Sequence, residues 1–255
     1  GRYHGLQMAL NRPFKHGLML KGAYTWSQAK DMTTNGEDGW VGLTWNHPMK
    51  YDDNFDIAVF DRTHIAQLGF LYELPFLKDN QSVIGKILGG WQINGIGSWY
   101  SGTPYSIGGT NNALNCQGCG SVFINFAGDK PEPIGAVGSG TTETYYDKSL
   151  FSQPTGLDVN GFGTSKRSQF RRPNVWNVDL SLFKSFQVGR VRPEIRIEVA
   201  NVFNHPNWGN PVIDFTANNF LQFIPANADS GSGTVTGATN TPGPRLVQIG
   251  LRLQF

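Results

Sequence analysis

Hydrophobic and polar residues alternate along much of this chain with a period of two, which is the side-chain period of a β-strand. Around residue 68, for example, Ala66, Leu68 and Phe70 share one side while Gln67 and Gly69 share the other. The same alternation predicts strands over residues 3–12, 18–27, 62–74, 90–100, 174–183, 193–203 and 245–255. No segment makes a convincing amphipathic helix, so we expect an all-β chain.

The predicted strands fit a soluble sandwich, with its apolar face inward, as well as a membrane barrel, with its apolar face outward. The connections separate the two architectures, because short ones (12–17, 75–89 and 184–192) alternate with long ones (28–61, 101–173 and 204–244). Outer-membrane barrels combine short periplasmic turns with long external loops, and a sandwich has no reason for this asymmetry. Strands of about ten residues are also long enough to cross a bilayer at a tilt.

Large aromatic residues stand at the ends of these strands on the apolar side. The residues at the long-loop ends are Trp26, Trp99, Trp176 and Phe203, and those at the short-turn ends are Phe14, Phe76, Trp91 and Phe255. Two girdles of this kind are typical of membrane barrels. The sequence therefore predicts a segment of an antiparallel, up-and-down transmembrane β-barrel with long extracellular loops.

The direction of the strands follows from the same pattern. With short turns in the periplasm, the C-terminus is periplasmic, and both the first and the last strand run toward the periplasm. Single-chain bacterial barrels have an even number of strands from eight upward, and lipid does not tolerate unpaired strand edges. We therefore expect these seven strands to pair with others from outside the chain.

Composition narrows the remaining classes of protein. The 255 residues carry a net charge of +2, only 16% are charged, and 32 are Gly, which excludes a coiled coil and a highly charged disordered chain. The net charge gives no argument for nucleic acid. No run of about 18 apolar residues predicts a membrane-spanning helix. The chain opens at Gly1 with no initiator Met or signal peptide, which is typical of a mature or clipped product.

Several motifs resemble the C-terminal barrel of TonB-dependent outer-membrane receptors, most closely the Oar-like group with a carboxypeptidase-regulatory-like domain. The motifs are Phe60-Asp61-Arg62-Thr63-His64, Tyr72-Glu73-Leu74-Pro75-Phe76, Gly89-Gly90-Trp91-Gln92-Ile93-Asn94-Gly95, Ser101-Gly102-Thr103-Pro104-Tyr105, Asn177-Val178-Asp179-Leu180-Ser181-Leu182-Phe183-Lys184 and Val202-Phe203-Asn204-His205-Pro206-Asn207-Trp208-Gly209.

The resemblance implies a nutrient transporter of the bacterial outer membrane with a plug domain, a TonB box and about 22 strands. Residues 1–255 correspond to about the last third of such a barrel and contain neither plug nor TonB box. The implied partners are outer-membrane lipid, lipopolysaccharide, the remaining barrel strands and plug, and TonB through the missing N-terminal part. The terminal Leu251, Leu253 and Phe255 resemble the signal read by the outer-membrane insertion machinery.

Two other classes of function stay open at this point. The chain could be a processed surface protein whose open strand edges self-assemble into a fibre or layer. An enzyme is the weaker option, because Glu194 and Glu198 lie about 13 Å apart along a strand, beyond the ~9.5 Å limit for an inverting glycosidase pair. With Arg196 between them and Arg252 on the next strand, a charge ladder facing the barrel interior is favoured, and we assign no catalytic residue.

Cys116 and Cys119 form a Cys-x-x-Cys motif in an external loop. A single pair supplies half a zinc site, and no helix N-terminus is predicted that would activate a redox thiol. An oxidising compartment favours a local disulfide, with metal binding and redox chemistry as alternatives. Asp52, Asn54 and Asp56 partly match the start of a calcium loop, although Ile57 replaces the turn glycine and a solvated acidic loop is the alternative.

Two sets of loop residues are candidates for surface recognition. Lys166, Arg167, Arg171 and Arg172 cluster at the expected outer rim, where they would meet lipopolysaccharide phosphates. Trp40, Trp45 and Trp208 are candidates for stacking on a sugar ligand or for packing the loops together. We expect no cofactor, no resident metal and no nucleic-acid partner, since the five histidines are scattered and basic and aromatic residues are not interleaved.

Overall fold

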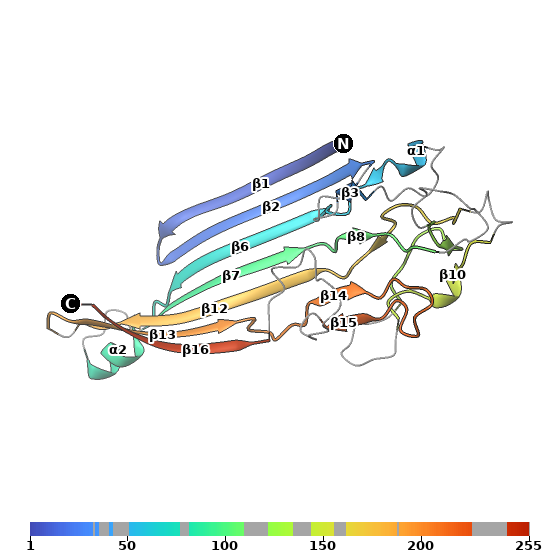
Figure 1. The fold of residues 1–255 in the computed structure, drawn as a ribbon. Helices are drawn as coiled ribbons and strands as arrows, with labels where there is room; N and C mark the ends of the chain where they lie inside the picture. Colours follow the sequence, from blue (N-terminus) through green and yellow to red (C-terminus); the bar gives the residue numbers. More distant parts are fainter. Residues whose placement is uncertain are drawn as a thin grey trace.

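The chain, seen in a computed structural model that describes residues 1–32, 34–35, 41–42, 51–76, 82–109, 122–134, 144–155, 162–187, 189–225 and 244–254, is built on one antiparallel sheet. Figure 1 shows its long strands side by side, with α2 at one end of the sheet and the other short elements gathered at the opposite end. The long strands are β1 (Arg2–Lys15), β2 (Leu18–Asp31), β6 (His64–Glu73), β7 (Gln92–Tyr100), β12 (Val175–Ser185), β13 (Arg192–Ala200) and β16 (Leu246–Gln254).

The short elements lie between these strands. They are β3 (Thr34–Asn35), β4 (Val41–Gly42), α1 (Tyr51–Asn54), β5 (Asp56–Ile57), α2 (Val83–Leu88), β8 (Pro104–Tyr105), β9 (Asn125–Phe126), the 3-10 helix η2 (Lys148–Leu150), β10 (Phe151–Ser152), β11 (Phe170–Arg171), β14 (Trp208–Pro211) and β15 (Phe223–Pro225). Within the described part of the chain, no helix is long and apolar enough to cross a membrane.

Each long strand falls on one of the predicted segments, and the sheet order β1-β2-β6-β7-β12-β13-β16 follows the chain order. Some strand ends differ from the prediction, because residues with a positive φ stop or turn the chain there. The β1–β2 turn contracts to His16 and Gly17, whose φ angles of 53° and 76° suit a tight hairpin. At the other end, β13 stops before Asn201, which takes a φ of 49° and donates its N–H to the Asp179 carboxylate at 2.8 Å.

Three short helices of the described residues, α1, α2 and η2, were not predicted from the sequence. The second, α2, has six residues and is capped at its N-terminus by Ser82, whose hydroxyl accepts a hydrogen bond from the Gly85 N–H at 3.0 Å. Six residues make fewer than two helical turns, too few for a 3.6-residue periodicity to stand out in the sequence.

Strand register gathers the apolar positions on one side of the sheet. Leu20 lies opposite Phe70, Ile93 opposite Leu182, and Ile197 opposite Ile249. These pairs continue across all the long strands, so the apolar residues form one continuous surface, the apolar face. Ile249 is 75% exposed on it, and no second sheet of the described residues packs against it. A soluble sandwich with this face sealed inside is therefore excluded.

The buried hydrophobic core lies in the connections rather than in the sheet. Residues 101–109, 122–134, 144–155, 162–174 and 201–225, here called the loop assembly, gather at the end of the sheet opposite α2 (Figure 1). Phe170 is fully buried at its centre, with its ring centroid 5.3 Å from that of Phe126 and 5.4 Å from that of Phe151. The core cluster comprises Tyr105, Ile107, Ile124, Phe126, Tyr146, Phe151, Phe170, Phe220 and Leu221.

Gly102, where β7 passes into the loop assembly, provides a test of this packing. A Cβ atom at residue 102 would collide with the backbone carbonyl of Arg172, and backbone cannot rotate away as a side chain can. We expect Gly102→Ala to destabilise the loop assembly by about 3 kcal/mol or more. Limited proteolysis of the folded protein in detergent should show the loops cut faster.

The matched control is Gly97→Ala on β7, where the added Cβ would meet its nearest neighbour, Val178, at an ordinary 3.8 Å. Equal protease sensitivity of the two variants would contradict the packing described here.

Candidate functional site: the apolar face and the loop assembly

The apolar face has the composition expected inside a soluble protein but is open to the surroundings. Leu6, Met8 and Leu10 on β1 are each more than half exposed, and so is Leu251 on β16. A water-soluble monomer rarely exposes a continuous apolar patch larger than a few hundred Å². This face is therefore suited to contact with hydrocarbon.

A row of rings borders the apolar face at its loop end. Trp26 lies opposite His64, and Trp99 lies opposite Trp176, which also contacts the Phe203 ring at a centroid distance of 5.8 Å. His64 and Trp99 close the gap between the two pairs, with centroids 6.1 Å apart. Rings that carry both apolar and polar atoms prefer the boundary between hydrocarbon and water.

The opposite face of the sheet carries hydrogen-bonded polar side chains. The Gln67 amide donates to the Tyr100 hydroxyl at 2.8 Å, and the Gln92 amide donates to the Glu73 carboxylate at 2.8 Å. The predicted charge ladder also lies on this face: Arg196 bonds Glu194 and stands 3.9 Å from Glu198. Arg252 is the register partner of Glu194. One face is thus wettable and the other is not.

A comparison with protein families agrees with this two-faced sheet. A family model described as an outer membrane beta barrel domain matches residues 1–248. The chain belongs to this outer membrane β-barrel domain family. The family confirms the predicted fold class and places the protein in the bacterial outer membrane. No curated protein and no solved structure matches the chain.

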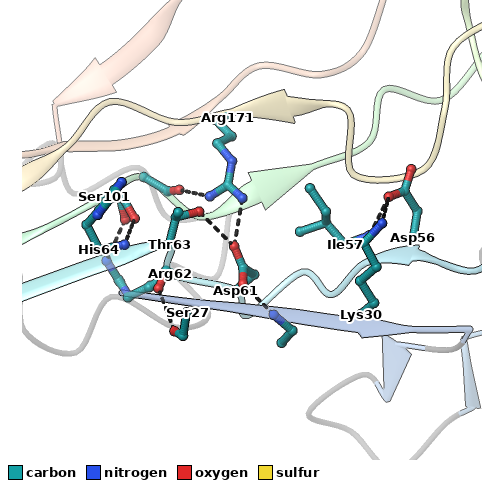
Figure 2. A network of polar contacts seen from close by, with 12 residues as sticks. Ser27, Lys30, Asp56, Ile57, Asp61, Arg62, Thr63, His64, Ser101 and Arg171 are labelled. Atoms are coloured by element: carbon teal, nitrogen blue, oxygen red, sulfur yellow. Dashed lines mark hydrogen bonds and ion pairs between the residues drawn. The ribbon is translucent and has the colours of Figure 1, made fainter. Parts of the chain in front are cut away.

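In this outer-membrane barrel domain, the loop assembly is joined to the wall by a buried ion pair (Figure 2). The Asp61 carboxylate, 2% exposed as a residue, accepts hydrogen bonds from the Ala29 N–H at 2.7 Å and the Thr63 hydroxyl at 3.2 Å. Arg171 of β11 donates to the same carboxylate at 2.7 Å and to the Gly102 carbonyl at 3.0 Å. One aspartate thereby connects β2, the start of β6 and the loop assembly.

Two of the motifs recognised in the sequence meet beside this ion pair. The His64 N–H donates to the Ser101 hydroxyl at 3.0 Å, and the Ser101 N–H donates to the His64 carbonyl at 2.9 Å. Arg62 reaches the Ser101 carbonyl at 3.2 Å, and its own carbonyl accepts from the Ser27 hydroxyl at 3.3 Å. These residues therefore fix where the chain leaves the sheet, as Figure 2 shows.

The four basic residues predicted to face lipopolysaccharide do not form a joint exposed patch. Arg167 is 1% exposed and donates to the Asp31 carboxylate at 2.5 Å and to the Asn54 carbonyl at 3.2 Å. Arg171 is held by Asp61, as described above. Arg172 bonds the Thr103 hydroxyl and lies over the Tyr105 ring, where burial lowers the pKa of its guanidinium. Lys166 alone of the four is exposed.

The calcium candidates do not converge on a site. Asp52 is exposed, Asn54 is buried, and the Asp56 carboxylate accepts from the Ile57 N–H at 2.8 Å and lies 3.8 Å from the Lys30 ammonium. Among the described residues, no three His, Cys, Asp or Glu side chains come close enough together to hold a metal ion.

The other candidates divide between buried, exposed and undescribed positions. Trp208, a candidate for sugar stacking or for packing the loops together, is 8% exposed, which agrees with packing in the interior of the loop assembly. Leu251 and Leu253 are exposed on the apolar face, and their role as a barrel-assembly signal stays a prediction. Trp40, Trp45, Cys116, Cys119 and Phe255 lie outside the described residues.

Sequence reasoning missed the tyrosines and phenylalanines that give the loop assembly its own core. Tyr146 shows their role: its hydroxyl donates to the Arg171 carbonyl at 2.8 Å and accepts from the Arg171 N–H at 3.2 Å. Burial raises the pKa values of the Tyr146 and Tyr105 phenols, so both stay protonated. The available signal was the density of aromatic residues within the long 101–173 connection, such as Tyr145-Tyr146 and Phe170.

Asp61→Ala tests the junction between wall and loops. The substitution leaves the Arg171 guanidinium and the Ala29 N–H without their carboxylate acceptor. Removing one partner of a buried ion pair costs about 3 kcal/mol. We expect the free energy of unfolding to fall by that amount, as measured by urea denaturation in lipid vesicles followed through tryptophan fluorescence.

Lys30→Met is the comparison, because the Lys30–Asp56 pair is solvent-accessible and spans 3.8 Å. An exposed pair contributes less than about 1 kcal/mol. Similar losses in both variants would mean that Asp61 is not the main link between the loop assembly and the sheet.

Proposed function

We propose that this chain forms part of the barrel wall of a TonB-dependent outer-membrane transporter, of the Oar-like group, that imports a scarce or large nutrient. The observation that carries the proposal is the sheet itself, with one exposed apolar face and one hydrogen-bonded polar face. The apolar face meets membrane lipid, and the polar face lines the interior beside the plug domain. Energy for import comes from TonB through the plug.

The proposed orientation puts the loop assembly outside the cell and the short turns in the periplasm. Long external loops and short periplasmic turns are the general rule for bacterial barrels. The connections after β2, β7 and β13 are the long ones here, and all three leave the sheet at the same end. The loop assembly then stands where a nutrient first arrives, with Lys166 toward the lipopolysaccharide.

The directions of the two edge strands fit a membrane barrel that is completed by further, oppositely directed strands. Among the described strands, β1 pairs only with β2, and β16 pairs only with β13. Six antiparallel steps separate them, so β1 and β16 run in the same direction. Copies inserted the same way offer each other only parallel partners. An antiparallel partner has to be an oppositely directed strand from the rest of the barrel.

Nutrient uptake tests the transport proposal. We expect at least one compound to be depleted from the medium by wild-type cells, but not by cells that lack this gene or lack TonB. Mass spectrometry of spent medium identifies the compound, and restoring the intact gene should restore its depletion. Depletion that needs the gene but not TonB would indicate passive passage and overturn the energised mechanism.

Accessibility to a membrane-impermeant maleimide tests the orientation. With Cys116 and Cys119 replaced by Ser in the full protein, Ile134→Cys in the loop assembly should react in intact cells. Arg190→Cys, in the exposed turn between β12 and β13, should react only after the outer membrane is permeabilised. The reverse labelling pattern would show that the barrel is inserted the other way.

A further inference from the structure

The helix α2 exposes its large apolar residues and buries its glycines, which is the opposite of what a surface helix does in water. Ile84, Ile87 and Leu88 share one face by their i, i+3, i+4 spacing, and they are 65%, 56% and 50% exposed. Gly85 on the helix, and Gly89 just after it, are the buried positions. A surface helix in water buries its large apolar residues and exposes its small or polar ones, so the surroundings of this helix are not water alone.

Lys184 attaches α2 to the sheet on the side of the apolar face. The residue follows Leu182 by two positions on β12 and is the register partner of Ile195, so its side chain starts on that face. Its buried ammonium donates to the Lys86 carbonyl at 2.6 Å, the Ile87 carbonyl at 2.8 Å and the Gly89 carbonyl. An ammonium has three donors, and the last carbonyls of a helix lack partners within it, so both sets are satisfied together.

The surroundings of this contact continue the apolar face. The Lys184 ammonium lies 5.6 Å from the centroid of the Trp91 ring and 5.0 Å from that of Phe186. Phe76, at the same short-turn end of the sheet, is 63% exposed. The exposed residues of α2 thus extend a surface already assigned to lipid, at the end of the strands where hydrocarbon gives way to headgroups.

We infer that α2 is an interfacial helix that inserts Ile84, Ile87 and Leu88 among the phospholipids of the inner leaflet of the outer membrane. The inference rests on the proposed orientation, which puts the short turns on the periplasmic side. Phospholipid fits because the helix offers an apolar face for acyl chains and the exposed ammonium of Lys86 for a phosphate headgroup. Lys184 acts as a positioning residue that keeps the helix at this depth.

Fluorescence quenching by lipid-borne nitroxides tests the inference. The full protein, with Cys116→Ser and Cys119→Ser, is labelled with an environment-sensitive fluorophore at Ile87→Cys and reconstituted into phosphatidylcholine–phosphatidylglycerol vesicles. The vesicles carry a nitroxide either near the headgroup or near the end of the acyl chain. We expect the shallow nitroxide to quench position 87 about twofold more than the deep one, as an interfacial helix requires.

Labels at residues 249 and 134 serve as controls for the membrane core and for the loop assembly. Ile249→Cys, in the middle of β16 on the apolar face, should be quenched most by the deep nitroxide, and Ile134→Cys in the loop assembly by neither. No quenching at 87 with quenching at 249 would overturn the inference and leave the membrane barrel standing. No quenching at either position would remove the proposed membrane placement of the sheet as well.

Lys184→Met tests the attachment of the helix. The substitution keeps an apolar side chain on β12 but removes the three bonds to α2, so quenching at 87 should fall while quenching at 249 stays unchanged. Unchanged quenching at 87 would overturn the positioning role of Lys184. Ile84→Cys supplies a second reporter on the same helix face if a label at 87 impairs folding.

Discussion

Strand register is the constraint on which the rest of this structure depends. Inside a bilayer the backbone N–H and C=O groups have no water to bond, so each strand has to be paired with its neighbours over its whole length. Because side chains alternate, a slip of one residue in any pairing would send a row of polar groups to the lipid side. The alignment of Leu20 with Phe70 and of Ile197 with Ile249 therefore fixes both faces at once.

The loop assembly obeys the opposite rule, since it is built as a water-soluble protein is. Its aromatic residues pack around Phe170, and its arginines Arg167 and Arg171 are paired with aspartates. Two Arg–Asp pairs join the loop assembly to the sheet. Arg167 pairs with Asp31 at the end of β2, and Arg171 pairs with Asp61 just before β6. The junction between the sheet and the loop assembly thus runs through these two carboxylates.

The long strands could be predicted because a period of two repeated over about ten residues is a strong local signal. The alternation also constrains register, since the apolar faces of neighbouring strands have to align. The loop core could not be predicted in the same way, because its strands have two to four residues and its contacts join distant segments. Arg167 illustrates the difficulty: an arginine in a basic, glycine-rich stretch looks like a solvated surface residue. Only the fold brings Asp31 within 2.5 Å of it.

The short helices and the buried aromatic residues could not be predicted either, because local sequence does not show the tertiary contacts on which they depend. The six residues of α2 are too few to show a helical period. The side of the sheet on which its exposed isoleucines lie follows only from the hydrogen bonds between Lys184 and the helix. The sequence left open whether Trp208 stacks on a ligand or packs the loops together, and only the folded loops show that it is buried. Exposure in a membrane protein's loops depends on tertiary contacts that local composition does not record.

The two Arg–Asp pairs also constrain the order in which the molecule can form. Arg167 is 136 residues from Asp31 along the chain, and Arg171 is 110 residues from Asp61. Contacts of such long range form late, because the intervening chain has to be ordered first. Here β2, β6, β7 and β12 have to be in register before either arginine can reach its partner. Formation of these two ion pairs therefore depends on the register of the strands that separate their partners, so a slipped sheet would leave both carboxylates without their arginines.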